Sequence, residues 1–194
     1  MATSRLPYIL VAGVIALCIV AYMLLLSRPS ALSPESIVAD VKEMFVLESV
    51  AFENGGEIPS KYSLKGENIS PPLKWSGQPP NTVSLILIMY DPDAPGGIFY
   101  HWILYNIPNT LTSLPEGVPK AEETIYGLQG INSYGNIGYG GPSPPPGSRH
   151  RYVFLLLALD VRLSLEGGAR VSEVLEACRG HIIAYAELSG YYSG

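Results

Sequence analysis

Charged residues, cysteines and histidines are all scarce in this sequence. Asp, Glu, Lys and Arg make up 15% of its 194 residues, with a formal net charge of −5, and there are two cysteines and three histidines. Basic residues cluster only at Arg149, His150 and Arg151. Because binding to nucleic acid depends on a basic stripe that neutralises phosphates, we expect no nucleic-acid partner.

The two cysteines do not indicate a disulfide scaffold. Cys18 lies inside an apolar N-terminal run, and Cys178 lies near the other end of the chain. A bond between them would join that run to the globular part of the protein. We therefore expect no disulfide, and the count says little about the redox compartment.

Hydrophobic residues, glycine, proline and tyrosine are abundant instead. Hydrophobic residues make up 47% of the chain, with 20 Gly, 17 Pro and 13 Tyr against 4 Phe. Tyrosine favours strands, whereas glycine and proline favour turns. The composition predicts a mainly β domain of short strands and many turns.

The N-terminal run YILVAGVIALCIVAYMLLL, residues 8–26, contains no charged residue. As a helix rising ~1.5 Å per residue it would span the ~30 Å hydrocarbon core of a bilayer, so we predict one transmembrane helix. A cleaved signal peptide is the alternative, but its apolar region is usually only ~7–15 residues long. The positive charges of Arg5 and the amino terminus slightly exceed the single charge of Arg28 on the other side of the run, which favours a cytoplasmic N-terminus. We therefore expect a single-pass protein of the cell membrane with an extracytoplasmic domain.

The rest of the chain is predicted as a tether followed by one domain. Residues 1–7 form an N-terminal tail, residues 27–43 a polar tether whose second half favours a short helix, and residues 44–194 the domain. Apolar runs bounded by Pro or Gly predict buried strands, and VSEVLEACRG predicts a helix with Ser172 as N-cap. The strands are expected at 83–90, 101–107 and 151–160, and the helix at 171–180.

Four polar residues stand at the ends of these predicted strands. Asp91 and Asp93 follow the first strand, separated by Pro92, while His101 and His150 open the next two. The loop 128–150 holds six Gly and four Pro, and a loop of this length in a compact domain is usually functional or disordered. Backbone N–H groups at its glycines could help to hold an anion. Spacing alone leaves open whether these groups converge.

Several motifs resemble the phosphatidylethanolamine-binding protein (PEBP) family, most closely its bacterial and archaeal Raf-kinase-inhibitor-like branch. They are DPDAP followed by His-Trp, an apolar strand ending in Asn-Ile-Pro, and Gly-Pro followed by His-Arg-Tyr. The resemblance covers residues 44–194. It implies a two-sheet antiparallel Greek-key β-sandwich with a short C-terminal helix. The transmembrane helix would precede this sandwich and is not part of the family core.

The family resemblance also implies a function. We expect a non-enzymatic protein whose small pocket binds an anion, such as phosphate or a phospholipid headgroup, without metal or cofactor, and which inhibits or modulates a protease or kinase. Matched residue by residue, the pocket positions fall on seven residues: Asp91, Asp93, His101, Gly141, Pro142, His150 and Tyr152. The Pro-rich stretch before His150 departs from the family pattern.

Two acids beside an anion require an explanation. The first possible explanation is that each Asp accepts a hydrogen bond from an imidazole, which favours cationic histidines. The second is that one Asp is protonated. A hydrolase is the rival function, with His101 or His150 as base, but Ser143 lacks a nucleophile motif. The plainest alternative is that Asp91 and Asp93 merely shape a turn.

Overall fold

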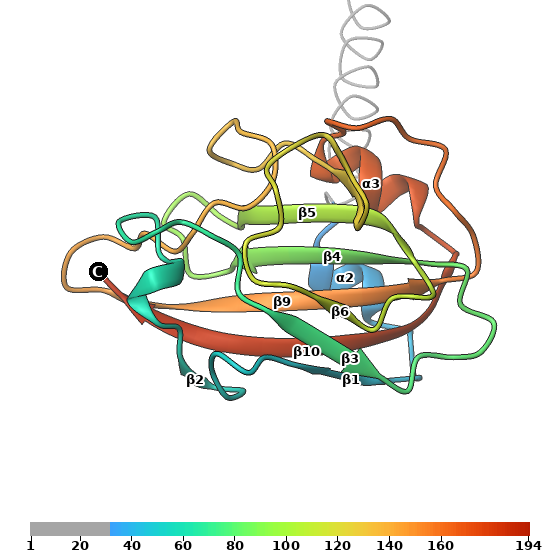
Figure 1. The fold of residues 1–194 in the computed structure, drawn as a ribbon, viewed down its shortest axis with the longest axis horizontal. Coiled ribbons are helices and arrows are strands. Elements are labelled where there is room, and N and C mark those ends of the chain that lie inside the picture. The colour runs from blue at the N-terminus through green and yellow to red at the C-terminus, as the bar shows by residue number, and fades with distance from the viewer. Residues whose placement is uncertain (1–31) are drawn as a thin grey trace, which may run out of the picture. The chain divides into compact units, whose positions relative to one another are not determined.

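The computed structural model describes residues 32–194, which fold into two β-sheets and short helices (Figure 1). A five-residue helix and a seven-residue helix, α2 and α3, accompany the sheets, together with a single 3-10 turn, η1. Their bounds are α2 Pro34–Val38, η1 Ser60–Tyr62 and α3 Val171–Ala177. The smaller sheet has the order β1 (Val46–Glu48), β3 (Leu73–Ser76), β6 (Ser113–Leu114).

The larger sheet holds the long strands. In spatial order it contains β2 (Gly56–Glu57), β10 (Ile182–Ser193), β9 (Arg149–Leu159), β4 (Ser84–Asp91), β5 (Phe99–Pro108), β8 (Gly127–Gln129) and β7 (Glu123–Thr124). The chain leaves β5, passes through β6, β7 and β8, and returns to pair β9 with the other side of β4. In the order β9-β4-β5-β8 the last of the four strands along the chain lies beside the first, which is the arrangement of a Greek key.

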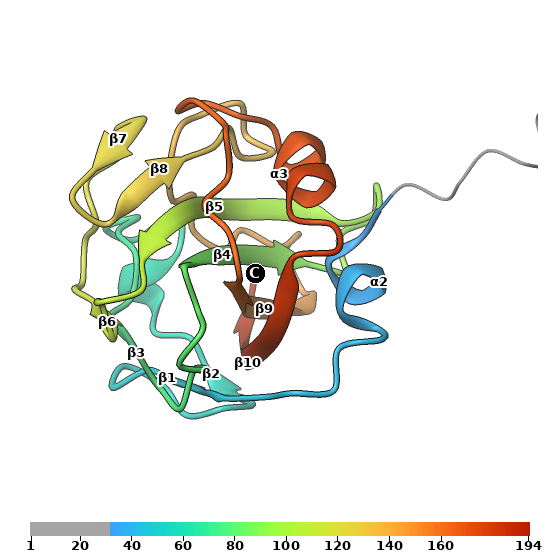
Figure 2. The same ribbon diagram turned by 90° about the vertical axis from the view of Figure 1, so that its right-hand side faces the viewer.

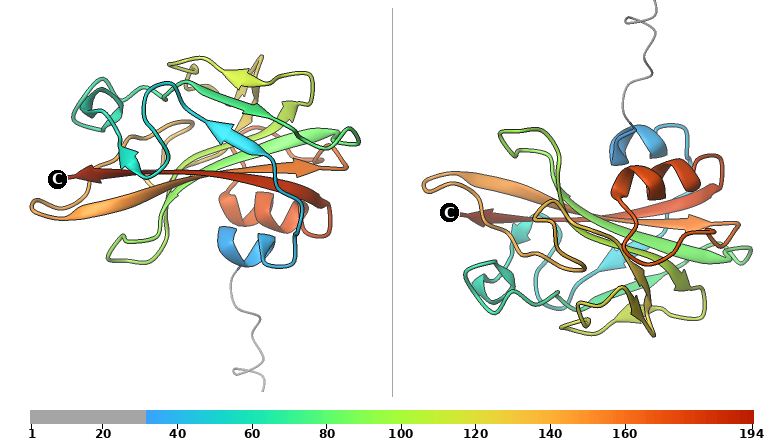
Figure 3. Two further views of the ribbon diagram at one scale, coloured as in Figure 1. Left: turned by 90° about the horizontal axis from the view of Figure 1, so that it is seen from below. Right: turned by 90° about the horizontal axis from the view of Figure 1, so that it is seen from above.

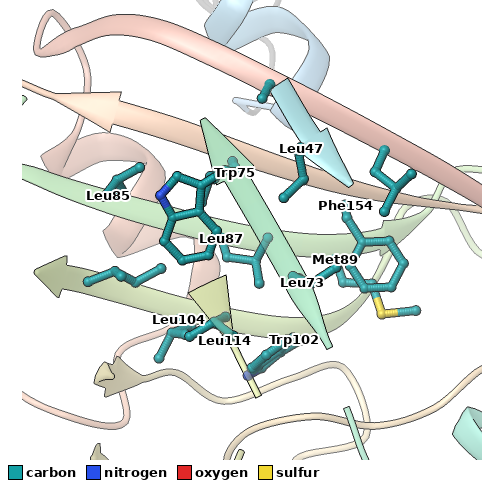
Figure 4. Close-up of a cluster of buried hydrophobic side chains, with 14 of the residues drawn as sticks. Leu47, Leu73, Trp75, Leu85, Leu87, Met89, Trp102, Leu104, Leu114 and Phe154 are labelled. Atoms are coloured by element: carbon teal, nitrogen blue, oxygen red, sulfur yellow. The ribbon is translucent and has the colours of Figure 1, made fainter. Parts of the chain in front are cut away.

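Strand β4 is buried on both faces because each face of the larger sheet is covered. Leu85, Leu87 and Met89 belong to the core shared with the smaller sheet (Figure 4), whereas Ile86 and Ile88 belong to a second core on the opposite face. This alternation follows from the two-residue period of a strand. It explains why the sequence of β4 reads as one continuous apolar run.

The helices cover the second face of the larger sheet. Val174 and Leu175 of α3 are buried there, and Ile37 and Val38 of α2 pack against the same core. Figures 2 and 3 show α2 and α3 side by side on this face, with the smaller sheet on the other. The short helices therefore form a third layer.

The predicted transmembrane helix requires a correction. Among residues 32–194, no helix has the length and apolarity needed to cross a bilayer. Helices α2 and α3, with five and seven residues, measure only about 8 and 10 Å, against a hydrocarbon core of about 30 Å. The expected span, residues 8–26, lies outside the described residues. The fold class is therefore a mainly β domain with short helices, and the single-pass membrane location and the domain boundaries stay predictions.

A second correction concerns strand direction, because the larger sheet is mixed. Strand β2 pairs with β10 in parallel, at Gly190 with Gly56, while the other pairs in this sheet are antiparallel. A two-residue edge strand carries no sequence signal of its direction. The three predicted core strands are confirmed as β4, β5 and β9.

The predicted helix near residue 171 is confirmed, but its first residue differs. Helix α3 begins at Val171, so the expected N-cap Ser172 lies inside it. The Glu173 carboxylate accepts a hydrogen bond from the backbone N–H of Arg170 at 2.7 Å, which gives a partner to the N–H group just before the helix.

Candidate functional site

Three central strands bring polar residues to one end of the larger sheet. Asp91 ends β4 and pairs with Phe99 near the start of β5, while His150 lies at the start of β9. Because β4 is antiparallel to both neighbours, its end lies beside their beginnings. This end of the sheet also carries the C-terminus (Figure 1).

A cavity of about 220 Å³ opens at this end of the sheet. Its volume lies below the ~300–1,000 Å³ of pockets for drug-sized ligands, so it suits a small group. No Lys or Arg side chain from the described part of the chain lines it. The lining residues are Asp91, Ala94, Pro95, Phe99, His101, Tyr134, Ser143, Pro144, Pro145, His150 and Tyr152.

Asp91 is buried and both of its carboxylate oxygens accept hydrogen bonds. Oδ1 accepts from the backbone N–H of Asp93 at 2.8 Å, and Oδ2 lies 2.7 Å from Nδ1 of His150. A carboxylate only accepts, so the proton between them belongs to the imidazole. The bond from Asp93 closes the turn that the sequence predicted. The bond to His150 fixes the orientation of its ring and leaves Nε2 for a ligand.

His101 is buried and neutral. Its Nδ1 lies 2.7 Å from the carbonyl oxygen of Gly140, so Nδ1 carries the proton. Burial lowers the pKa of His101 to about 4, although the Gly140 carbonyl and Asp91 act in the opposite direction. At neutral pH its Nε2 is therefore an acceptor.

The Tyr152 side chain adds a phenol hydroxyl to this cavity. The hydroxyl is buried and forms no hydrogen bond of normal geometry with a described residue, although the Asp91 carboxylate and the backbone N–H of Ser143 lie close enough to shift its pKa. Burial raises the pKa of Tyr152, as does the negative charge of Asp91, while the backbone N–H of Ser143 acts in the opposite direction. The hydroxyl thus remains a protonated donor, with a backbone N–H close by.

The structure places the other three expected residues away from the cavity lining. The Asp93 carboxylate accepts from the backbone N–H of Arg151 at 2.8 Å. The Pro142 carbonyl accepts from Leu64 at 2.9 Å, and Gly141 lies so close to the 62–64 backbone that a Cβ would stand 2.3 Å from a carbonyl oxygen. These residues support the loop, and ligand contact by any of the seven stays a prediction.

The predicted pairing of each Asp with an imidazole is confirmed at Asp91 and His150 but is wrong at Asp93, which contacts a backbone amide. His101 is neutral because burial outweighs the opposite effect of the Gly140 carbonyl. The backbone N–H groups expected to be free in the loop are also occupied. Those of Gly138, Gly140 and Gly141 donate to Gly130, His101 and Asn68 respectively.

Sequence reasoning missed the aromatic wall of the cavity. The ring of Phe99 lies 5.0 Å from that of His101 and 4.7 Å from that of Tyr134. Phe99 was within reach of prediction, because it shares a strand face with His101 by the two-residue period. Tyr134 comes from the irregular loop and carries no such signal.

The described residues hold no group of three or more His, Cys, Asp and Glu side chains suited to a metal ion. The fold and these side chains define a β-sandwich with a small pocket at one end, in which a few polar side chains lie among apolar ones. A sequence model of the family described as phosphatidylethanolamine-binding protein matches residues 48–193. The chain therefore belongs to the PEBP family, as its motifs predicted.

Related sequences come from archaea and bacteria. A UPF0098 protein of Methanothermobacter thermautotrophicus is 50% identical over 147 residues, which cover 75% of this chain and 97% of that protein. A UPF0098 protein of Pyrococcus horikoshii is 46% identical over 155 residues, 78% of each chain.

Solved structures agree with the fold. A homologue of phosphatidylethanolamine-binding proteins from Chlamydia trachomatis, CT736, is 45% identical with a TM-score of 0.72 and covers 79% of this chain and 99% of its own. Escherichia coli YbcL, described as a member of the mammalian PEBP family, is 32% identical with a TM-score of 0.72, covering 77% and 98% respectively.

Proposed function

We propose that this protein binds a small oxyanion, such as phosphate or the phosphate of a lipid headgroup, in the cavity beside Tyr152. The observation that carries the proposal is the Tyr152 hydroxyl, which is buried and forms no hydrogen bond of normal geometry with the described residues, although Asp91 and the Ser143 N–H lie near it. A buried hydroxyl without a partner costs roughly 1–3 kcal/mol, and a ligand oxygen would recover this cost.

The surrounding groups are compatible with an anion even though Asp91 carries a negative charge. Both oxygens of Asp91 already accept hydrogen bonds, so the charge is partly compensated. Since Nδ1 of His150 is committed to Asp91, Nε2 is the nitrogen of this ring that is left for a ligand.

The substitution Tyr152→Phe tests this proposal. It should weaken phosphate binding about tenfold by removing the donor, while unfolding free energy stays equal or rises by about 1 kcal/mol because the uncompensated hydroxyl is gone. Phosphate titration by calorimetry and urea unfolding measure the two effects. Tyr185→Phe is a matched control outside the cavity lining.

Unchanged phosphate affinity in Tyr152→Phe would contradict the proposal. A loss of both affinity and stability would show instead that the hydroxyl has a structural role. Phosphoethanolamine and inorganic phosphate, compared in the wild type, separate a headgroup from a free anion.

The hydrolase alternative has partial geometric support. Asp91 and His150 form an acid–imidazole pair at 2.7 Å, and Ser143 lines the same cavity. Among the described residues, however, no hydrogen bond joins the Ser143 hydroxyl to either imidazole, and a nucleophile requires such a base. Ester turnover that is lost in His150→Ala would favour this function.

Inhibition or modulation of a protease or kinase stays a prediction from the family resemblance. Pro95 and Pro145 are exposed and form a stiff part of the cavity lining that such a partner could contact. Inhibition of a purified protease or kinase that is lost in a Pro145 variant would support it.

A further inference from the structure

A second cavity lies on the other side of Tyr134. Its volume is about 570 Å³, within the ~300–1,000 Å³ range of pockets that hold organic ligands. Tyr134 is common to the linings of both cavities. The second cavity is lined by Leu64, Asn68, Lys120, Asn132, Tyr134, Asn136, Ile137, Tyr139 and Gly140.

Three side chains of this lining, those of Lys120, Asn68 and Asn136, have donors without partners among the described residues. No Asp or Glu belongs to it, and within residues 32–194 no carboxylate forms an ion pair with Lys120. Lys120 is an exposed residue, although partial burial lowers the pKa of its ammonium.

Two side-chain amides add further donors. The Oδ1 atom of Asn68 accepts from the backbone N–H of Gly141 at 2.8 Å, which leaves its NH₂ group as the free end. Asn68 holds a left-handed backbone, φ 54°, to make this contact. The side chain of Asn136 makes no hydrogen bond to another described residue, whereas the hydroxyls of Tyr134 and Tyr139 donate to backbone carbonyls.

We infer that this cavity is a second binding site, in which Lys120, Asn68 and Asn136 hold the phosphate or carboxylate group of an organic ligand. An ammonium and two NH₂ groups offer an anion several donors with no competing acid. Leu64, Ile137 and the Tyr134 ring supply apolar surface for the rest of such a ligand. The site is separate from the Tyr152 cavity and does not depend on its function.

Nuclear magnetic resonance titration of the described domain within the full chain tests this inference, with inorganic phosphate and acetate as probes at low ionic strength. We expect saturable shifts at the Asn136 and Asn68 side-chain amides. Lys120→Gln should weaken this response about tenfold, because it removes a charged donor. Lys42→Gln, which removes an equal charge outside this cavity, should leave it unchanged.

Asn136→Asp provides a second variant, since it places a carboxylate in the same exposed position and should abolish the response. Tyr152→Phe should leave the response intact, so a failure of this inference can be distinguished from a failure of the function proposed for the Tyr152 cavity. A response to both probes indicates anions in general, and one to phosphate alone indicates phosphate esters. Absent shifts, or equal shifts in wild type and Lys120→Gln, would overturn the inference.

Discussion

His101 shows how burial can decide the chemistry of one residue. Its position at a strand start made it a candidate cation, yet it is 2% exposed and its Nδ1 donates to a carbonyl. Sequence spacing placed His101 near the start of a strand but could not give its surroundings. The neutral state follows from burial, which outweighs the opposite effect of the Gly140 carbonyl, 39 residues away.

The buried state of His101 predicts acid sensitivity. Its pKa is lowered from 6.5 to about 4, so below pH 6.5 the unfolded chain binds a proton that the folded chain does not. Stability should therefore fall as the pH falls from 6.5 towards 4, by up to about 3 kcal/mol from this residue. Urea unfolding across this range measures the slope.

The substitution His101→Gln should flatten that slope, because it removes the buried imidazole. Equal slopes in His101→Gln and wild type would show that other groups cause the acid sensitivity.

At the scale of elements, the loop between β8 and β9 is held by contacts rather than by regular structure. The Gly141 amide, the Pro142 carbonyl and the Tyr139 hydroxyl all bond to the segment 62–68. Gly140 is also required, because a Cβ there would stand 2.6 Å from the Tyr134 ring. The wall shared by the two cavities depends on these contacts.

The close approach at Gly141 predicts a costly substitution. Gly141→Ala would place a Cβ 2.3 Å from the Tyr62 carbonyl oxygen, and should lower the unfolding free energy by about 1–3 kcal/mol. It should also weaken phosphate binding by displacing Ser143. Gly96→Ala, in another loop of the site, meets no atom within 4 Å and should change stability by less than about 0.5 kcal/mol. Equal effects of both substitutions would contradict this account.

The elements differ in how far their sequence predicted them. Strands β4, β5 and β9 were predictable because their apolar runs are long and bounded by Pro or Gly. Pairing of these strands, and with it the meeting of Asp91, His101 and His150, required the family resemblance. The roles of Asn68 and Tyr134 could not be predicted, since they arise from contacts between irregular loops.

At the scale of the described domain, one sheet supports two cores. Leu87 faces the core shared with the smaller sheet, and its neighbour Ile88 faces the helices. Both are fully buried and belong to the strand that ends at Asp91. The pocket therefore depends on packing in both layers.

This arrangement predicts one cooperative unfolding transition despite two cores. Leu87→Ala and Ile88→Ala should each lower the unfolding free energy by about 2–5 kcal/mol. Transitions followed by tryptophan emission and by far-ultraviolet circular dichroism should coincide in both variants. Val83→Ala, at a 48% exposed position just before β4, should cost less than about 0.5 kcal/mol. Separate transitions in Ile88→Ala would show that the helix layer unfolds alone.

Each of the two sheets contains one tryptophan. Trp75 belongs to β3 of the smaller sheet and Trp102 to β5 of the larger one, and both lie in the core drawn in Figure 4. Trp102 also follows His101 of one cavity and packs edge-on against Tyr139 of the other. A single indole is thus next to both proposed sites, while the second reports on the opposite sheet. With one tryptophan replaced by phenylalanine at a time, the intrinsic fluorescence of this chain can distinguish ligand entry from separation of the two sheets without an added dye.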